Sequence, residues 1–305
     1  MLHHMPHKLL SASHFNFTEL APGVGFGEAP DVAWYALPYV PLIVFVGVTG
    51  VGKSTTLQAL REQQFNFALL PDRRELTDHL IIAFLQRQAG VAPHPVTDRT
   101  ERFQLTRRYR EQFSGGMSHA LSQLLVRIGT QQDIDSTPVP SSRNQQRWWI
   151  FDGLRGANEV QAAATLLPHA RFVVLDAPDA VRVERLLGRA DHFDRVALQA
   201  LYSSTPSAEH SFATIGVLEA DALFDREEIA GLLSLCVAPI GTGTVAVDDL
   251  RTRLKIVAEE RRNYDPAAAI QTLTREANER TLVIDTTQVD AAQAASQMIE
   301  WLPAQ

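Results

Sequence analysis

Short apolar runs alternate with stretches of helical spacing from residue 39 onward. The runs are continuously apolar, as expected of parallel strands that helices cover on both faces. After the second run, for example, Leu76, Leu80 and Phe84 recur one helical turn apart. This alternation predicts repeated βα units and therefore an α/β fold. The five predicted strands are Leu42–Val46, Phe65–Leu70, Trp148–Phe151, Phe172–Leu175 and Leu282–Ile284.

Two kinds of segment interrupt this pattern. Residues 1–38 contain many His, Pro and Gly residues without helical or strand periodicity, and they are interpreted as an N-terminal arm that packs on a domain or stays mobile. Residues 39–305 are interpreted as one domain with insertions at about 91–147 and 199–280. The first insertion holds an arginine-rich helical stretch and a second helix near 117–128, and neither insertion has an obvious apolar core of its own.

Net charge, cysteine content and hydropathy argue against several classes of protein. The 305 residues carry a formal net charge of -7, so the chain has no overall basic field for a polyanion, which argues against a nucleic-acid partner. Cys236 is the only cysteine and therefore excludes an intrachain disulfide and a cysteine-based zinc cluster. The N-terminus lacks the apolar core of a signal peptide. Pro38 and Pro41 interrupt the uncharged stretch between Asp31 and Lys53, so no membrane span is expected, and the protein is expected to be cytoplasmic.

A glycine-rich motif directly follows the first predicted strand and precedes a predicted helix. Its residues fit the pattern G-x-x-x-x-G-K-[ST]. Glycines let the backbone curl around phosphates with its N–H groups turned inward, and the following helix directs its positive end at the same oxygens. Lys53 would reach the β- and γ-phosphates, and the Ser54 hydroxyl would bind Mg²⁺. A plain glycine turn is the structural alternative. The residues predicted to bind a nucleotide are Gly47, Val48, Thr49, Gly50, Val51, Gly52, Lys53, Ser54 and Thr55.

This strand–loop–helix resembles the Walker A motif of P-loop NTPases, and its fuller form, GVTGVGKST, is similar to the adenylate kinase-like branch of nucleotide and small-molecule kinases. The resemblance covers about residues 40–195 and 281–287. It implies a three-layer αβα fold with a five-stranded parallel sheet in the order 2-3-1-4-5. ATP is favoured over GTP as the nucleotide because the sequence has no Asn-Lys-x-Asp motif for reading guanine.

An acidic residue follows the third predicted strand. Asp152 comes after the run Trp148–Phe151, in the form of a Walker B element whose carboxylate holds Mg²⁺ directly or through water. Asp176, which follows the fourth strand, is the alternative, although an N-capping role would explain it equally well. Arg155 completes a turn similar to the family's Asp-Gly-x-x-Arg, in which the arginine grips the phosphoryl acceptor, but here it stands one residue closer.

Several further arginines are candidates for contacts with phosphate. Arg182, Arg185 and Arg189 share a helix face, and Arg195 follows them. The resemblance implies that Arg185, Arg189 and Arg195 belong to a lid that stabilises charge on the transferring phosphoryl group. The alternative is a solvated face paired with Glu184 and Asp191.

Two other groups of arginines receive different predictions: one is predicted to bind the acceptor and the other to form a solvated helix. Arg73 and Arg74 follow the second strand, where nucleotide kinases meet the acceptor, so they are candidates for binding an acidic or phosphorylated substrate. The arginines between Arg99 and Arg110 are interpreted as a solvated helix, and Arg107, Tyr109 and Arg110 offer too little aromatic surface for a nucleic-acid platform.

The sequence thus predicts a Mg²⁺-dependent phosphotransferase that uses ATP, with Lys53, Asp152 and the lid arginines as its catalytic group. The first alternative is a nucleotide-dependent ATPase that acts as a regulator or switch and binds a protein partner through its insertions. The second is a nucleotide-binding module without turnover.

Overall fold

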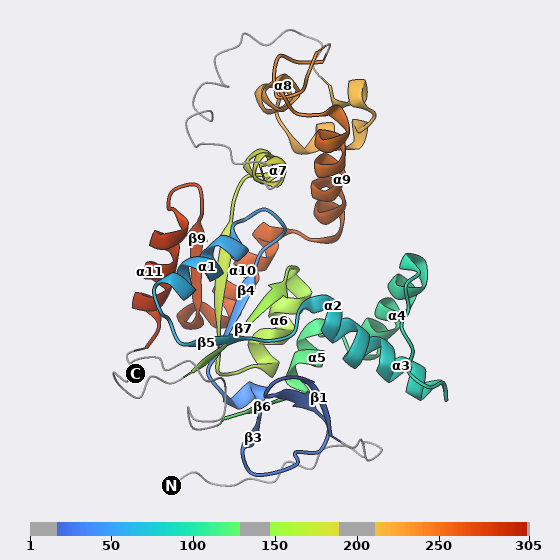
Figure 1. Cartoon of the computed structure of the whole chain (residues 1–305), viewed down its shortest axis with the longest axis vertical. Coiled ribbons are helices and arrows are strands. Elements are labelled where there is room, and N and C mark those ends of the chain that lie inside the picture. The colour runs from blue at the N-terminus through green and yellow to red at the C-terminus, as the bar shows by residue number, and fades with distance from the viewer. Residues whose placement is uncertain (1–16, 129–146, 189–210, 239, 304–305) are drawn as a thin grey trace. The chain divides into compact units, whose positions relative to one another are not determined.

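The computed structural model describes residues 17–128, 147–188, 211–238 and 240–303 (Figure 1). Its contacts divide the chain into two compact units. The first unit comprises Met1–Ile43, Phe67–Asp152 and Ala162–Ala170. The second unit comprises Val44–Asn66, Gly153–Gln161 and Arg171–Gln305.

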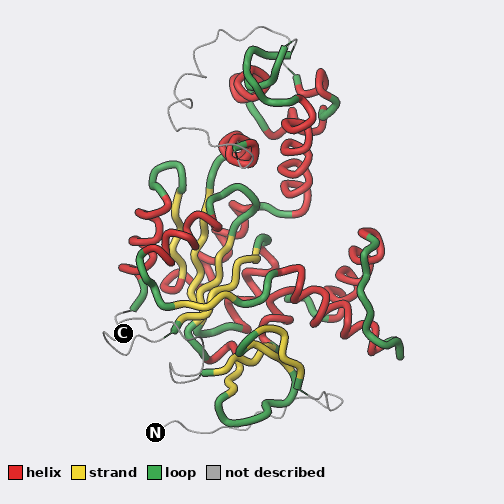
Figure 2. The backbone as a smooth tube through the Cα atoms, in the orientation of Figure 1, coloured by secondary structure: helices red, strands yellow, loops and turns green. Residues whose placement is uncertain are grey.

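Five strands form one parallel sheet in the order β5-β7-β4-β8-β9. Figure 2 shows these strands running side by side. In chain order the sheet reads 2-3-1-4-5, so the predicted α/β fold class and the predicted strand order are both confirmed. The strands are β4 (Leu42–Val46), β5 (Phe67–Leu69), β7 (Trp148–Leu154), β8 (Ala170–Asp176) and β9 (Thr281–Asp285).

The apolar runs form strands because helices cover both faces of the sheet and bury them. All five residues of β4 are buried, which is the environment of a central strand in a parallel sheet. β9 lies at one edge of the sheet, and its Val283 side chain is exposed. β8 and β9 pair from Phe172 opposite Thr281 to Asp176 opposite Asp285. The carboxyl ends of these two strands therefore lie at the same edge of the sheet.

Helices follow the strands as predicted. In the second unit, α1 packs against α11, and both α10 and α11 contact β9. The helices are α1 (Lys53–Glu62), α2 (Arg73–Leu76), α3 (Ala83–Gln88), α4 (Arg99–Gln112), α5 (Met117–Ser122), α6 (Ala157–Leu166), α7 (Asp179–Leu187), α8 (Arg226–Ser234), α9 (Val247–Asn263), α10 (Pro266–Ala277) and α11 (Ala291–Trp301). Shorter helical turns are η1 (Leu37–Tyr39), η2 (Thr77–Ile82), η5 (Phe212–Ile215), η6 (Leu218–Leu223) and η7 (Asn278–Arg280).

A second sheet was not expected from the sequence. It is antiparallel, with the order β1-β2-β6-β3, and it joins residues interpreted as an arm to the first insertion. Its strands are β1 (Thr18–Ala21), β2 (Val24–Phe26), β3 (Trp34–Ala36) and β6 (Leu124–Arg127). Three or four residues are too short for an alternating pattern to stand out. β6, which pairs with β2 and β3, is a strand at the place where the sequence suggested the end of a helix.

The second insertion packs around an apolar core that includes α7 from the frame of the fold. Val183 of α7 lies in one buried cluster with Phe212, Leu232, Leu254 and Val257. The sequence did not indicate a core here, because the contributing residues lie far apart along the chain. Through this core, α7, α8 and α9 form a packed helical group in the second unit. Among the described residues, no helix is both long and apolar enough to cross a membrane.

Candidate functional site

The glycine-rich loop connects β4 to α1 within the second unit. Its glycines have positive φ values: 149° at Gly47, 89° at Gly50 and 97° at Gly52. A Cβ at Gly47 would lie 2.7 Å from the carbonyl oxygen of Leu175, and one at Gly50 would lie 3.0 Å from that of Arg182. Side chains at these two positions would therefore be both strained and obstructed. The glycines allow the loop to curl tightly against β8 and α7.

Lys53 lies across this loop. Its Nζ donates hydrogen bonds to the carbonyl oxygens of Gly47 and Val48, each at 2.9 Å. The side chain begins at the first residue of α1 and folds back over the start of the loop. A positive charge is thereby held beside the turn that the sequence predicts to bind phosphates.

The N-terminus of α1 has the properties of an anion site. Gly52 is its N-cap residue and supplies no side chain, so the first-turn N–H groups and the positive end of the helix dipole are not capped by a side chain in this part of the structure. The hydroxyls of Thr55 and Thr56 instead donate to the carbonyl oxygen of Gly52, at 2.7 Å and 3.1 Å. Ser54 is exposed, as a metal ligand at the start of the helix needs to be.

A buried ionic network lies against the loop. Arg182 of α7 is completely buried, its Nε donates to the carbonyl oxygen of Thr49 at 2.8 Å, and its two terminal nitrogens pair with Asp179 and Glu260. Arg261 pairs with the other oxygen of Asp179 at 2.5 Å. The solvated-face alternative is therefore wrong for Arg182, whose partners are internal carboxylates rather than Glu184.

Glu260 of α9 is a contact of the loop that sequence reasoning missed. Its carboxylate accepts hydrogen bonds from the Thr49 hydroxyl at 2.6 Å and from the Thr49 N–H at 3.1 Å and 3.2 Å. It also pairs with Arg155 at 2.9 Å. In the sequence, Glu260 is one of two adjacent glutamates in a charged helix, and nothing distinguishes it from Glu259.

Arg155 is thus at the loop, but as a member of an ion pair. The residue directly follows β7, and the carbonyl oxygen of Leu154 accepts a hydrogen bond from the Gly47 N–H at 3.1 Å. Its guanidinium group lies 5.9 Å from the ring centre of Tyr264 and its side chain is 30% exposed. The Arg155 Nε is buried and has no hydrogen-bond partner among the described residues. Because the side chain is 30% exposed, part of the guanidinium group remains accessible to a ligand.

Arg185 also contacts the loop. One terminal nitrogen lies 3.4 Å from the Gly50 carbonyl oxygen and donates to the Thr286 hydroxyl at 2.7 Å, and the other donates to the Thr286 carbonyl oxygen at 2.7 Å. The arginine is therefore held between the loop and the segment that follows β9. Arg189 and Arg195, the other predicted lid arginines, lie outside the described residues.

The two candidate carboxylates differ in their surroundings. Asp152 is half-buried in β7, which continues to Leu154 and neighbours β4 in the sheet. Asp176 ends β8 and does not cap α7, so the capping explanation for this residue is wrong. Burial raises the pKa of the Asp176 carboxyl above its usual range, although the hydrogen bond from the Ala177 backbone and the charge of Arg261 oppose that shift.

The remaining candidates for acceptor binding lie in the first unit. Arg73 and Arg74 open α2, whose N-terminus is capped by Asp72; Arg73 is half-buried and Arg74 is exposed. In α4, Arg107 forms an exposed pair with Glu111, as expected of a solvated helix.

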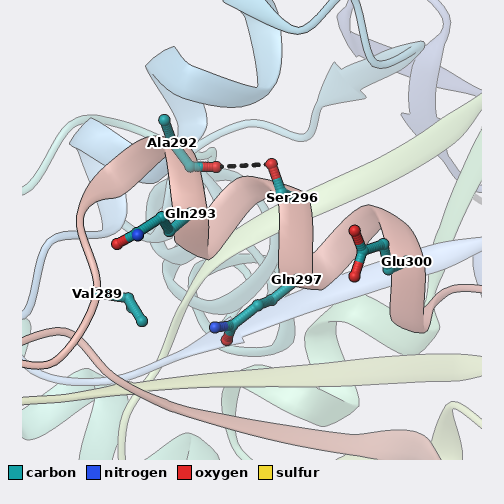
Figure 3. A pocket seen from close by; sticks show the side chains of 6 residues that line it. All are labelled: Val289, Ala292, Gln293, Ser296, Gln297 and Glu300. Carbon is teal, nitrogen blue, oxygen red and sulfur yellow. Dashed lines mark hydrogen bonds between the residues drawn. The ribbon is translucent and has the colours of Figure 1, made fainter.

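A hollow of about 350 Å³ lies elsewhere in the second unit, along α11 (Figure 3). None of its lining residues belongs to the glycine-rich loop. The lining side chains come from one face of α11 and the turn before it: Val289, Ala292, Gln293, Ser296, Gln297 and Glu300.

The strand order 2-3-1-4-5, together with the glycine-rich loop between β4 and α1, is the arrangement of a P-loop fold. No protein-family model and no curated protein matches the chain. One similar solved structure is a shikimate kinase from Acinetobacter baumannii in complex with shikimate, with 16% identity over 87% of this chain and 94% of that chain and a TM-score of 0.29. Another is a gluconokinase from Sinorhizobium meliloti 1021, with 14% identity over 87% and 96% of the two chains and a TM-score of 0.29.

Proposed function

We propose that residues Gly47–Thr55 bind the triphosphate of ATP. The observation that carries this proposal is the loop itself, which combines glycine-only conformations, an uncapped helix N-terminus and the amino group of Lys53 around one turn. The amino group and the helix N-terminus favour negative charge, and the glycines let the backbone curl around it, so that together they suit a chain of phosphates.

The donor set also fits Mg²⁺, which prefers oxygen ligands and retains several waters. Ser54 would supply the hydroxyl ligand, and Asp152 the carboxylate, with Asp176 as the alternative. When bound, the ion would neutralise charge on the phosphates. Asp152 is preferred for this role, because its strand, β7, lies beside β4, the strand that leads into the loop.

The reaction that this site suits is phosphoryl transfer to a small acceptor that is acidic or phosphorylated. Catalysis of phosphoryl transfer requires chiefly that the protein position the reactants and stabilise charge. Lysine and arginine side chains at a phosphate loop can do both. Arg155 would bind the acceptor, because its guanidinium group lies at the loop and is partly exposed. Arg73 and Arg74 remain predicted acceptor ligands.

Two measurements test this proposal. Titration calorimetry with Mg-ATP should give saturable binding, and the absence of heat on folded protein would contradict nucleotide binding. Transfer of labelled γ-phosphate to a panel of nucleoside monophosphates and small acidic or phosphorylated metabolites should then give a labelled acceptor. Labelled free phosphate alone would contradict the transferase.

The switch alternative has one observation in its favour. Glu260 places α9, a helix of the second insertion, in direct contact with Thr49 of the loop. A change in loop conformation on hydrolysis could therefore reach the insertion. ATP hydrolysis that rises when a second protein is added, without any labelled acceptor, would favour the switch over the transferase.

Replacing Arg155 with alanine is expected to raise the KM for the acceptor by about 10–100-fold and the KM for ATP by less than about threefold, because a charge-assisted contact with the acceptor is lost. Glu260 keeps Arg182 and Thr49 as partners in this variant. The measurement is steady-state kinetics with each substrate varied in turn, and Arg108→Ala, an exposed arginine of α4, is the matched control. An equal rise in both KM values would assign Arg155 to the nucleotide instead.

A further inference from the structure

Thr49, the third residue of the glycine-rich loop, is held on three of its atoms. Its N–H and its hydroxyl both donate to the Glu260 carboxylate, and its carbonyl oxygen accepts from Arg182. Both residues that hold it are buried: Glu260 is 8% exposed at its side chain and Arg182 is fully buried. Such a set of contacts determines the orientation of the Thr49 peptide group before any ligand arrives.

We infer that Glu260 is a positioning residue for phosphate binding: its carboxylate fixes Thr49 and so pre-forms the loop. This inference rests on the proposed function, in that the loop must bind phosphates. Gly47, Gly50 and Gly52 surround Thr49, and glycine gives the backbone more freedom than any other residue. A loop of this kind would lose much conformational entropy on binding, and contacts that order it beforehand reduce that loss.

The charge of Glu260 does not make it a competitor of the phosphates, because arginines balance it. Arg182 pairs with one carboxylate oxygen and Arg155 with the other, at 2.9 Å in the second case. The local group of Asp179, Glu260, Arg155, Arg182 and Arg261 has three positive and two negative charges. The Glu260 carboxylate is therefore paired on both of its oxygens, and its negative charge is balanced within this group.

Glu260 gives the second insertion a structural role, which is to support the phosphate loop. Glu260 lies in the last turn of α9, 211 residues after Thr49, and α9 packs on α7 through the apolar core described above. The helical group thereby supplies the phosphate loop with a rigid support that the strand–loop–helix alone lacks.

A pair of substitutions at Thr49 tests the inference. Thr49→Ser keeps the hydroxyl that donates to Glu260, whereas Thr49→Val keeps the branched shape without the donor; φ at Thr49 is not positive, so either side chain is compatible with the backbone. The ligands are magnesium tripolyphosphate, which contacts the loop without a nucleoside, and Mg-ATP. We expect Thr49→Val to weaken both by about 5–10-fold and Thr49→Ser to stay within about twofold of the wild type, since one charge-assisted hydrogen bond is lost only in the first.

A second pair tests the carboxylate directly. Glu260→Gln keeps the size of the side chain and removes its charge. Glu259→Gln is the control, because Glu259 is exposed in the same helix and its side chain contacts its helix neighbours Arg262 and Asn263, away from the loop. Glu260→Gln should weaken tripolyphosphate about tenfold, and Glu259→Gln should leave it unchanged. Titrations well below the melting temperature of each variant separate this effect from stability: a merely structural role would lower the melting temperature and leave the dissociation constant as it is.

The following results would overturn the inference. Equal binding by Thr49→Val and Thr49→Ser would mean that the hydroxyl does not order the loop, and this pair decides the matter even if Glu260→Gln does not fold. Tighter binding by Glu260→Gln would mean that the carboxylate competes with phosphate. A wild-type protein that binds neither ligand would overturn the proposed function as well, whereas wild-type binding with unaffected variants would overturn only the role of Glu260.

Discussion

Replacing Lys53 with alanine is expected to lower the turnover of Mg-ATP at least ~100-fold, which corresponds to about 2.7 kcal/mol. The Lys53 amino group is the charged side-chain donor placed over the start of the loop, and hydrogen bonds to charged groups contribute about 1.5–3 kcal/mol each. The fold should remain intact, because the side chain is half-buried and its contacts with the Gly47 and Val48 carbonyl oxygens can be replaced by water. Labelled-phosphate release and transfer measure the turnover, and circular dichroism checks the fold.

The matched control is Lys255→Ala. Lys255 is exposed in α9 and belongs to the same second unit, so the same change of side chain there should leave turnover within about twofold. Unchanged turnover in Lys53→Ala, or an equal loss in both variants, would contradict the assignment of Lys53 to the phosphates.

The frame of the fold could be predicted because its signals are local. A buried central strand such as Leu42–Val46 needs apolar residues at every position, and a tight turn between this strand and α1 needs glycine at Gly47 and Gly50. Both requirements are visible in consecutive residues. The strand order followed from the resemblance rather than from the strands themselves, since a parallel sheet leaves no trace of its order in any one strand.

The second sheet could not be predicted for the opposite reason. β2 has three residues, and its partner β6 lies about a hundred residues later, with Val24 opposite Val126. The burial of these valines results from the pairing and not from a pattern within either segment. Short strands of this kind are specified by tertiary contacts, which one segment of sequence does not reveal.

The contacts around the loop could be predicted only in part, because they too depend on segments that lie far apart in the sequence. The sequence predicted Arg155 as an acceptor ligand from its motif, and the family resemblance implied that Arg185 is a lid residue. It could not show that Glu260 meets both Thr49 and Arg155, because that contact depends on how α9 packs onto α7. Arg182 and Arg185 share a helix face and both contact the loop, yet Arg182 is fully buried between two carboxylates, whereas Arg185 bonds to Thr286. Helical spacing assigns residues to a face but does not tell what covers each turn of it.

Replacing Arg182 with methionine is expected to destabilise the second unit by about 3 kcal/mol, because two buried carboxylates lose the guanidinium group between them. Removal of one partner from a buried ion pair generally costs about 3–5 kcal/mol, and we expect the lower end because Arg155 still pairs with Glu260 and Arg261 with Asp179. For a unit of this size, the melting temperature should fall by about 6–12 °C.

The control is Arg107→Met, since that arginine is 69% exposed and pairs only with Glu111 among the described residues, so its loss should cost less than about 1 kcal/mol. Urea unfolding followed by circular dichroism compares the two variants. If they unfold at the same urea concentration, the ion network around Glu260 does not hold the loop region together.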